Sequence, residues 1–257
     1  MLLIAWRYHS VLLCNMLTIY LARHGQDEDN ASGILNGRRD MPLTDLGRTQ
    51  AATLAGKIRA TELSFDAIYS SPLQRAFETA SIVAAATTTK GLSGDKHINA
   101  ESIRKVDDLA ERDFGIMTGK PVVDISSICG PDDLLETPTV NYFLSPEGAE
   151  TFPQLKERAS RALAFLNEQH AAASSASSSS SSSSGGDCDH DDDHSILVVT
   201  HGDFGKMFYA AYYDLDWKDV LQEFHFGNSE VILCSPKISR PPSSDQTHIF
   251  SIEQFNS

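Results

Sequence analysis

The stretch LTIYLARHG, residues 17–25, joins a short apolar, β-branched run to an arginine, a histidine and a glycine. Such a run is typical of a buried strand. Arg23 and His24 at its end are costly to remove from water unless an anion binds them. The same arrangement recurs in SILVVTHG, residues 195–202, where His201 and Gly202 follow a second apolar run.

Both histidines are expected at one edge of a parallel sheet. Ligands of open α/β sheets bind outside the carboxyl ends of the strands, so His24 and His201 are predicted to lie in one crevice. The glycine after each histidine permits a tight turn and a close approach of the backbone to a ligand. One such histidine is often structural, but two with the same local pattern favour a shared site.

The rest of the chain alternates strand and helix patterns, which predicts an α/β fold with a mostly parallel sheet and helices on both faces. Thr44 is suited to cap the helix that follows it, and Pro72 to occupy the first turn of the next. The predicted strands are 17–22, 66–71, a segment within 97–103, 195–200, 230–235 and 247–255; the predicted helices are 44–60, 73–86, 152–172 and 203–213.

Three segments do not follow this alternation. Residues 106–151 are rich in Gly, Pro and Asp and are expected to form loops over a site. Residues 173–194, ASSASSSSSSSSGGDCDHDDDH, are predicted to be a disordered insertion, because polyserine cannot offset the entropy of ordering. Asp and His at the end of the insertion suggest a metal site, but a solvated linker is the favoured interpretation. Residues 1–15 are interpreted as an extension of unclear role, ahead of a single domain over 16–257.

The net charge and the cysteines limit which partners and which cellular compartment are expected for this protein. The formal net charge of −14 argues against nucleic-acid and anionic-membrane partners, which select basic surfaces. The four cysteines are far apart, which suggests a reduced, cytoplasmic protein. The first 20 residues, MLLIAWRYHSVLLCNMLTIY, contain no clean span of 18 apolar residues, so no transmembrane helix is expected there, although weak organelle targeting by residues 1–15 stays open. The chain is expected to act as a monomer or homodimer.

Arginines and histidines at one sheet edge indicate a phosphate ligand. Arg75 lies near the start of the helix after the 66–71 strand, on the same side of the sheet as Arg23, although its spacing alone favours a solvated helix residue. The arginine fork matches phosphate oxygens. A neutral histidine beside a phosphate can act as a nucleophile, and the leaving alkoxide then needs a carboxylic acid. Glu111 is the favoured acid, with Asp107, Asp108 and Asp113 as alternatives by composition.

Five segments together resemble, in order and spacing, the motifs of the histidine phosphatase superfamily, the phosphoglycerate-mutase-like family. They are RHGQDEDN (23–30), NGRRDMPLTDLGRTQA (36–51), SSPLQRAFETA (70–80), ERDFGIMTG (111–119) and VVTHGD (198–203). The resemblance runs from about Leu17 to Ser235 and implies a three-layer α/β/α sandwich with a mostly parallel sheet.

The resemblance also implies roles for individual residues. His24 is the phosphorylated nucleophile and Glu111 the proton donor, while Arg23, Arg75 and His201 complete the phosphate pocket. Asn30, Asn36, Gly37 and Gly202 match substrate-binding positions. Glu150 matches a position that supports the site loop, with a favourable charge at a helix N-terminus as the equal alternative. The family needs no metal and no other cofactor for this chemistry.

Three departures from the mutase pattern favour a phosphatase. Mutases of the family carry an aromatic hydroxyl and a lysine after the proton donor, where this chain has Phe114 and Val122, although Lys120 is close. They also carry a pair of arginines further along, whereas residues 121–151 contain no Arg or Lys. ERDFGIMTGK and SPEGAETFPQLKERA look most like the fructose-bisphosphatase-type and broad-specificity phosphatases.

The predicted activity is that of a histidine acid phosphatase-type enzyme: metal-independent hydrolysis of small phosphorylated metabolites, with sugar phosphates among the candidates. A cofactor-dependent phosphoglycerate mutase-type isomerase is the first alternative. A non-catalytic module that binds phosphorylated ligands is the second.

Overall fold

A five-stranded mixed sheet forms the centre of the protein in the computed structural model. The model describes residues 17–61, 63–89, 96–97, 100–138, 140–176, 194–223 and 225–236. The strand order is β5-β2-β8-β1-β9, and every neighbouring pair is parallel except β1 with β9. The strands are β1 (Thr18–Arg23), β2 (Ala67–Ser70), β5 (Arg104–Lys105), β8 (Ser195–Thr200) and β9 (Val231–Cys234).

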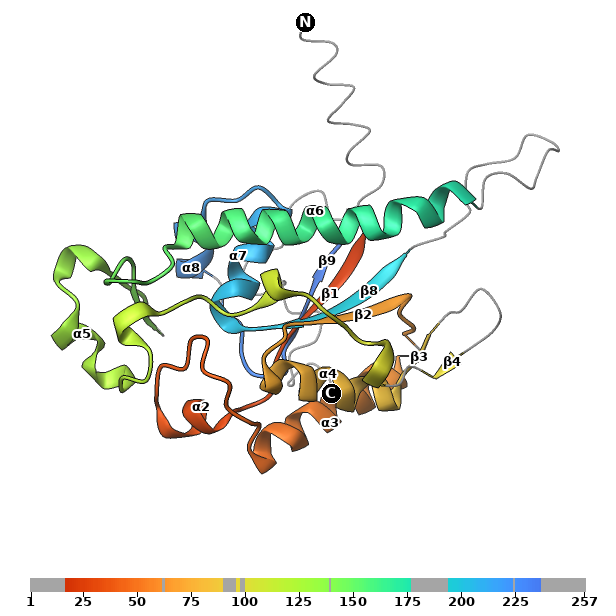
Figure 1. The fold of residues 1–257 in the computed structure, drawn as a ribbon, viewed down its shortest axis with the longest axis horizontal. Helices are drawn as coiled ribbons and strands as arrows, with labels where there is room; N and C mark the ends of the chain where they lie inside the picture. The colour runs from red at the N-terminus through yellow and green to blue at the C-terminus, as the bar shows by residue number, and fades with distance from the viewer. Residues whose placement is uncertain are drawn as a thin grey trace, which may run out of the picture.

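Helices cover both faces of this sheet (Figure 1), which confirms the predicted three-layer arrangement. On one face lie α3 (Asp45–Ala60) and α4 (Gln74–Ala86); on the other lie α6 (Phe152–Ala176), α7 (Gly202–Tyr212) and α8 (Trp217–Glu223). Successive strand residues alternate between the two cores. Ile19 and Val198 pack with α6 and α7, whereas Ala22 and Val199 pack with α3 and α4. Because both faces are covered, β1, β2, β8 and β9 are mostly apolar, whereas the edge strand β5 consists of exposed Arg104 and Lys105.

The start of α3 is as predicted, but the start of α4 differs. The Thr44 hydroxyl accepts a hydrogen bond from the Gly47 N–H at 3.0 Å, which caps α3. Pro72 lies outside α4, because Leu73 keeps an extended backbone and serves as the N-cap. The first helical N–H, that of Gln74, donates instead to the Asp40 side chain at 2.6 Å. A loop that is distant in sequence therefore caps this helix.

The predicted strand within residues 97–103 is wrong in position. Residues Ala100–Ser102 form a 3-10 turn (η1), and the edge strand is β5, whose two residues pair with Tyr69 and Ser70. β4 (Lys96–His97) pairs with β3 (Thr88–Thr89) in a separate two-stranded sheet. The partner strand β2 has only four residues, and its last two, Tyr69 and Ser70, pair with Arg104 and Lys105.

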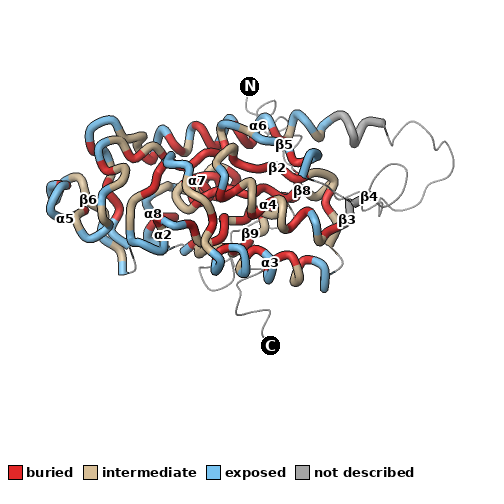
Figure 2. Tube along the Cα trace, turned by 60° about the horizontal axis from the view of Figure 1, so that its bottom comes forward, coloured by how far each residue is buried: buried red, intermediate tan, exposed pale blue. Residues whose placement is uncertain are grey.

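Residues 106–151 form a small lobe at one end of the sheet, beside the short helix α2 (Glu28–Ser32). The lobe has its own core of Phe114, Met117, Ile125, Cys129 and Phe143. It was predicted to be irregular; most of it is loop and single turns, but it also contains a β-hairpin. Its elements are η2 (Asp107–Leu109), η3 (Gly115–Met117), η4 (Val122–Asp124), α5 (Ile125–Ile128), η5 (Pro131–Asp133), β6 (Leu134–Glu136) and β7 (Asn141–Phe143). Buried segments concentrate in the central sheet, and α5 and β6 carry more exposed residues (Figure 2).

The long helix α6 reaches further than predicted. It continues through Ala176, four residues into the segment assigned to the 173–194 insertion, where alanines favour helix. Residues 177–193 lie outside the described residues, as do residues 1–15 and the predicted strand 247–255. Within the described ranges, no helix is long and apolar enough to cross a membrane.

Candidate active site

The structure brings His24 and His201 together at the carboxyl ends of β1 and β8. Their ring centroids lie 5.1 Å apart, and both side chains are buried. β1 and β8 pair in parallel with Arg23 opposite Thr200, so each chain leaves the sheet at the same level. Two residues 177 positions apart (201 − 24) therefore share one crevice, as the strand-end pattern predicted.

His24 has a defined tautomer. Its Nδ1 lies 2.6 Å from the Gly25 carbonyl oxygen, and only a protonated Nδ1 can donate to that oxygen. The lone pair is therefore on Nε2, which accepts a hydrogen bond from Arg75 Nε at 3.2 Å. Burial, and then the charges of Arg75 and Arg23, hold the pKa of His24 well below its ordinary value. His24 is thus neutral near pH 7, the state in which it can attack phosphorus.

Arg75 is fully buried at the start of α4, beside His24. Its two terminal nitrogens donate to the carbonyls of Arg39 at 2.6 Å and Gly37 at 2.8 Å. Its Nε also lies 3.2 Å from a carboxylate oxygen of Asp27. The residue is therefore held by the 36–39 loop and by an acidic partner, and it is far from the solvated helix residue that its spacing alone would suggest.

Asp27 is a site residue that sequence reasoning missed. It is fully buried, caps α2 through the Asn30 N–H at 2.7 Å, and accepts a 2.6 Å bond from the Asn36 side chain. Burial raises the pKa of Asp27 despite these donors and the charge of Arg75. The available signal was its position as a helix cap three residues after His24.

The predicted substrate residues Asn30, Asn36 and Gly37 line the loop beside the pocket. Asn36 directs its amide at Asp27, so in this structure it braces the loop. Asn30 Oδ1 accepts from the Asn228 side chain at 3.3 Å, and the same Asn228 amide donates to the His24 carbonyl at 3.0 Å. Gly37 has a φ of +50°, and a Cβ on it would lie 3.0 Å from the Phe114 ring.

Arg23 and His201 supply the candidate contacts for an anion. Within the described part of the chain, two buried polar atoms of this crevice have no hydrogen-bond partner: Arg23 Nε and His201 Nδ1. Arg23 Nη1 donates to the Phe226 carbonyl at 2.6 Å, which fixes the guanidinium. Gly202 is the first residue of α7, and a Cβ on it would lie 3.5 Å from the Arg23 guanidinium carbon. Buried groups without partners are rare in folded proteins, and these two atoms are candidate contacts for an anionic ligand.

His201 is also neutral. Its Nε2 lies 2.7 Å from the Ser71 hydroxyl oxygen. Burial, followed by the charges of Arg75, His24 and Arg23, lowers the pKa of His201 well below its ordinary value. Two neutral imidazoles and two arginines therefore gather at the strand ends, a set of donors and positive charges suited to a phosphate dianion.

Glu111 is buried at the N-terminus of α7. Its Oε1 accepts from the Arg112 N–H at 2.8 Å and the Phe204 N–H at 3.0 Å, and its Oε2 from the Asp203 N–H at 3.3 Å. Burial, and then the nearby charge of Asp203, raises the pKa of Glu111 despite these donors. Of the predicted alternatives, Asp107 is exposed and Asp108 and Asp113 are half-buried. A buried carboxyl with a raised pKa is suited to donate a proton.

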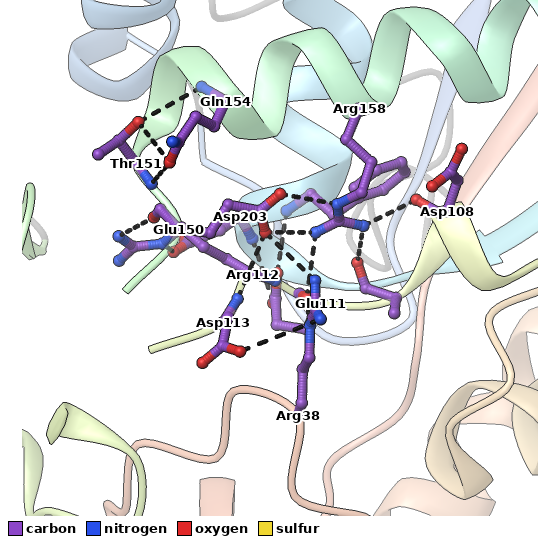
Figure 3. A network of polar contacts seen from close by, with 12 residues as sticks. Arg38, Asp108, Glu111, Arg112, Asp113, Glu150, Thr151, Gln154, Arg158 and Asp203 are labelled. Carbon is purple, nitrogen blue, oxygen red and sulfur yellow. Dashed lines mark hydrogen bonds and ion pairs between the residues drawn. The ribbon is translucent and has the colours of Figure 1, made fainter. Parts of the chain in front are cut away.

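Glu150 and Arg158 hold the loop that carries Glu111 (Figure 3). Arg158 binds the Glu150 carboxylate through two nitrogens, at 2.8 and 2.7 Å, and donates to the carbonyls of Asp108 at 2.8 Å and Ala110 at 2.7 Å. Burial alone would raise the pKa of Glu150, but the bonds and charge of Arg158 lower it. Sequence reasoning missed Arg158, because an arginine within an amphipathic helix is usually solvated.

Two further buried cations escaped sequence reasoning. Arg112 Nε donates to Asp203 Oδ2 at 2.9 Å, and its guanidinium lies 4.2 Å from the ring centre of Phe143. Lys206, on α7, donates to the Tyr142 hydroxyl, and burial lowers its pKa to about 8. Nothing in their sequence spacing marked either residue as buried.

Phe114 and Val122 occupy the two positions at which mutases of the family carry an aromatic hydroxyl and a lysine. Phe114 is buried against Phe143, with ring centroids 5.1 Å apart, and offers no hydroxyl to the site. Val122 is exposed, as is Lys120. The expectation that no metal takes part stays a prediction. Within the described residues, no three His, Cys, Asp or Glu side chains are arranged to hold a metal ion.

Comparison with known proteins agrees with this geometry. A family model described as histidine phosphatase superfamily (branch 1) matches residues 19–178. A 2,3-bisphosphoglycerate-dependent phosphoglycerate mutase of Bradyrhizobium diazoefficiens is 32% identical over 147 residues, which cover 57% of this chain and 65% of that protein. The matched region therefore spans just under two thirds of the length of that relative.

Two other proteins extend the comparison. Phosphoglycerate mutase-like protein 4 of Arabidopsis thaliana is 31% identical over 191 residues, which cover 74% of this chain and 69% of that protein. The solved structure of mycobacterial hydrolase 1 superposes with a TM-score of 0.63 at 22% identity, covering 84% of this chain and 88% of that one. The family model covers more than half of the 257 residues, and the fold agrees with it. The chain belongs to the histidine phosphatase superfamily.

Proposed function

We propose that this protein is a metal-independent phosphomonoester hydrolase that acts on small phosphorylated metabolites through a phosphohistidine at His24. One observation carries the proposal: the lone pair of a neutral His24 lies on Nε2, the His201 ring is 5.1 Å from the His24 ring, and Arg23 Nε and His201 Nδ1 have no partner among the described residues. A nucleophile and unfilled phosphate donors thus share one volume. Glu111 adds a buried acid at the adjoining helix end.

In the first half of the reaction, the phosphoryl group moves to His24. Phosphate oxygens accept from Arg23 Nε and from His201 Nδ1, which is protonated when the Ser71 hydroxyl donates to the other ring nitrogen. A phosphate oxygen also takes the Arg75 N–H that His24 Nε2 accepts in the free protein, which frees the lone pair. The N–P bond then forms as the ester P–O bond breaks, and the leaving oxygen takes the Glu111 proton.

In the second half, water hydrolyses the phosphohistidine. The ionised Glu111 accepts a proton from water as the water oxygen bonds to phosphorus. The N–P bond breaks, its electron pair returns to His24 Nε2, and inorganic phosphate leaves. Arg23 and Arg75 offset charge on the transferring group in both steps, while His201 donates a hydrogen bond to it. Glu111 ends protonated, ready for the next ester.

A phosphoglycerate mutase is the second candidate, because the relative from Bradyrhizobium diazoefficiens carries that name. The surroundings of the crevice support hydrolysis instead. Phe114 has no hydroxyl, and residues 121–151 have no cation to hold a second acidic group. Without such cations, the site has little positive charge with which to retain a bisphosphate, so water can reach and hydrolyse the phosphohistidine.

A panel of phosphate esters, assayed with and without chelator, tests the proposal. We expect hydrolysis of small phosphomonoesters that chelator does not reduce and that His24→Ala abolishes, together with acid-labile phosphate on the wild-type protein. Interconversion of 3- and 2-phosphoglycerate that depends on a bisphosphate primer would establish the mutase instead. Phosphate binding without turnover on any ester would indicate a binding module.

A further inference from the structure

We infer that Arg38 is a positioning residue that ties the loop holding Arg75 to the loop holding the proton donor Glu111. The inference rests on the proposed function, because it concerns how the nucleophile and the acid face one substrate. Arg38 touches neither His24 nor the crevice donors in the contacts described above. It acts through the residues on either side of it and through the main chain of Glu111.

The backbone around Arg38 belongs to the nucleophile side of the site. The neighbouring carbonyls, of Gly37 and Arg39, accept the two terminal nitrogens of Arg75 at 2.8 and 2.6 Å. Arg39 is itself held by a 2.9 Å ion pair with the buried Asp29. Arg75 in turn donates to the attacking nitrogen of His24. A shift of the Arg38 backbone would therefore move the two carbonyls that hold Arg75.

The side chain of Arg38 belongs to the acid side. Its Nε donates to the Glu111 carbonyl at 3.2 Å, and its terminal nitrogens lie 3.5 Å from a Glu150 carboxylate oxygen and 4.0 Å from an Asp113 carboxylate oxygen. Figure 3 shows the side chain reaching from its loop toward Glu111. Arg158 approaches from the other side and donates to the same Glu111 carbonyl at 3.2 Å. The two arginines therefore clamp the main chain of the acid.

This contact is suited to position the acid and adds little to stability. The Arg38 side chain is 47% exposed, and exposed ion pairs contribute about 0–1 kcal/mol. Arg158, by contrast, is buried and holds the loop by five hydrogen bonds. Loss of Arg38 should leave the loop folded but free to shift relative to Arg75. Catalysis is sensitive to displacements of about 1 Å, so the effect should fall on proton transfer.

Esters with different leaving groups distinguish a role in positioning the acid from a general effect on activity. A strongly basic alkoxide needs the Glu111 proton as it leaves, whereas a weakly basic nitrophenolate leaves with little help. The ratio kcat/KM reports the steps up to departure of the leaving group and omits hydrolysis of the phosphohistidine. A misplaced acid should therefore lower kcat/KM for alkyl esters much more than for nitrophenyl esters.

The experiment compares Arg38→Ala with Arg48→Ala. Arg48 is a matched control, because it is 45% exposed and forms a 2.7 Å ion pair with Glu78 on the neighbouring helix. We expect Arg38→Ala to lose about 10-fold in kcat/KM on alkyl phosphates and less than about 3-fold on p-nitrophenyl phosphate. Arg38→Lys keeps the charge but reaches fewer acceptors and should lie between wild type and Arg38→Ala. Both alanine variants should melt close to the wild type.

Several results would overturn the inference. An equal loss on alkyl and nitrophenyl esters would assign Arg38 to phosphate binding, and activity like that of Arg48→Ala would leave it no role. If Arg38→Ala melts early, the same comparison is made with Arg38→Lys, and a uniform loss there rejects the inference. A wild type that hydrolyses no ester rejects the proposed function, and this inference with it. An active wild type with a uniform Arg38 effect rejects the inference alone.

Discussion

Replacing Glu111 with Gln should separate catalysis from stability. The change keeps the shape of the side chain but removes its proton and its charge. As general acid, Glu111 is expected to contribute about 10²- to 10⁴-fold, or about 3–5 kcal/mol of the barrier. We therefore expect a loss of that size in kcat/KM on alkyl phosphates, with a smaller loss on p-nitrophenyl phosphate.

The effect of the same change on folding depends on pH. Burial raises the pKa of Glu111 in the folded protein above its value in the unfolded chain. Below the unfolded value, about 4.3, the carboxyl is protonated in both states and adds no pH-dependent cost. Above it the unfolded chain ionises first, so wild-type stability falls as pH rises, until the folded pKa is passed. Each pH unit of that elevation costs about 1.4 kcal/mol.

Glutamine avoids this cost but loses one hydrogen bond. Its carbonyl can still accept from the N–H groups of Arg112 and Phe204, the 2.8 and 3.0 Å contacts. Its amide replaces the oxygen that accepts from the Asp203 N–H at 3.3 Å. An unmade hydrogen bond of this kind costs about 1–3 kcal/mol. Near pH 5 the variant should thus be less stable than the wild type, and the difference should shrink or reverse toward pH 8.

Thermal melting between pH 4 and 8, together with kcat/KM on one alkyl ester, measures both effects. The Arg48→Ala variant controls for nonspecific changes in melting. Two results would refute the reasoning: alkyl-ester activity within a few-fold of wild type, or a wild type that gains stability over Glu111→Gln as pH rises. The first removes Glu111 as proton donor, and the second means that its pKa is not raised.

Two further predictions concern the loops around the site. Glu150→Gln weakens the two-point contact with the buried Arg158. Breaking a buried ion pair costs about 3–5 kcal/mol, and the cost is lower here because Glu150 is partly exposed, so urea unfolding should show a loss of about 2 kcal/mol. An unchanged free energy of unfolding would contradict the role of this pair in holding the acid loop. Gly37→Ala combines a φ of +50° with a Cβ 3.0 Å from the Phe114 ring, so it should destabilise the protein by about 1–2 kcal/mol. It should also lower activity through the Gly37 carbonyl that holds Arg75; a phosphatase assay of wild-type rate would argue against that link.

The order of strands and helices could be predicted where hydrophobic pattern alone decides it. β1, β2 and β8 are apolar because both faces of the sheet are covered, and Thr44 marks the start of α3. The edge strand β5 was misplaced, because only its partner β2 determines which residues pair. Pro72 was misplaced for a similar reason: the α4 N-terminus is capped by a side chain from another loop.

The residues of the site also divide into those that could be predicted from sequence and those that could not. His24 and His201 could be paired from sequence, since parallel strands end at one edge. Arg112 and Arg158 could not be found, because each is an ordinary polar residue in its local pattern, and Asp27 had only its position as a helix cap to mark it. Their burial depends on the lobe of residues 106–151 and on the 33–40 loop, whose conformation no periodic pattern predicts.

By itself, the sequence determined which chemical groups lie at the strand ends, because an apolar strand pattern and the residues that follow it are local features of the chain. Tertiary structure alone decided their chemical state. The raised pKa of Glu111 depends on its burial in the folded protein and on the charge of Asp203 on α7, which lies 92 positions away in the sequence. The depressed pKa of His24 likewise depends on Arg75, brought there from 51 positions away. Protonation is set by burial and by charges close in space, and chain proximity measures neither.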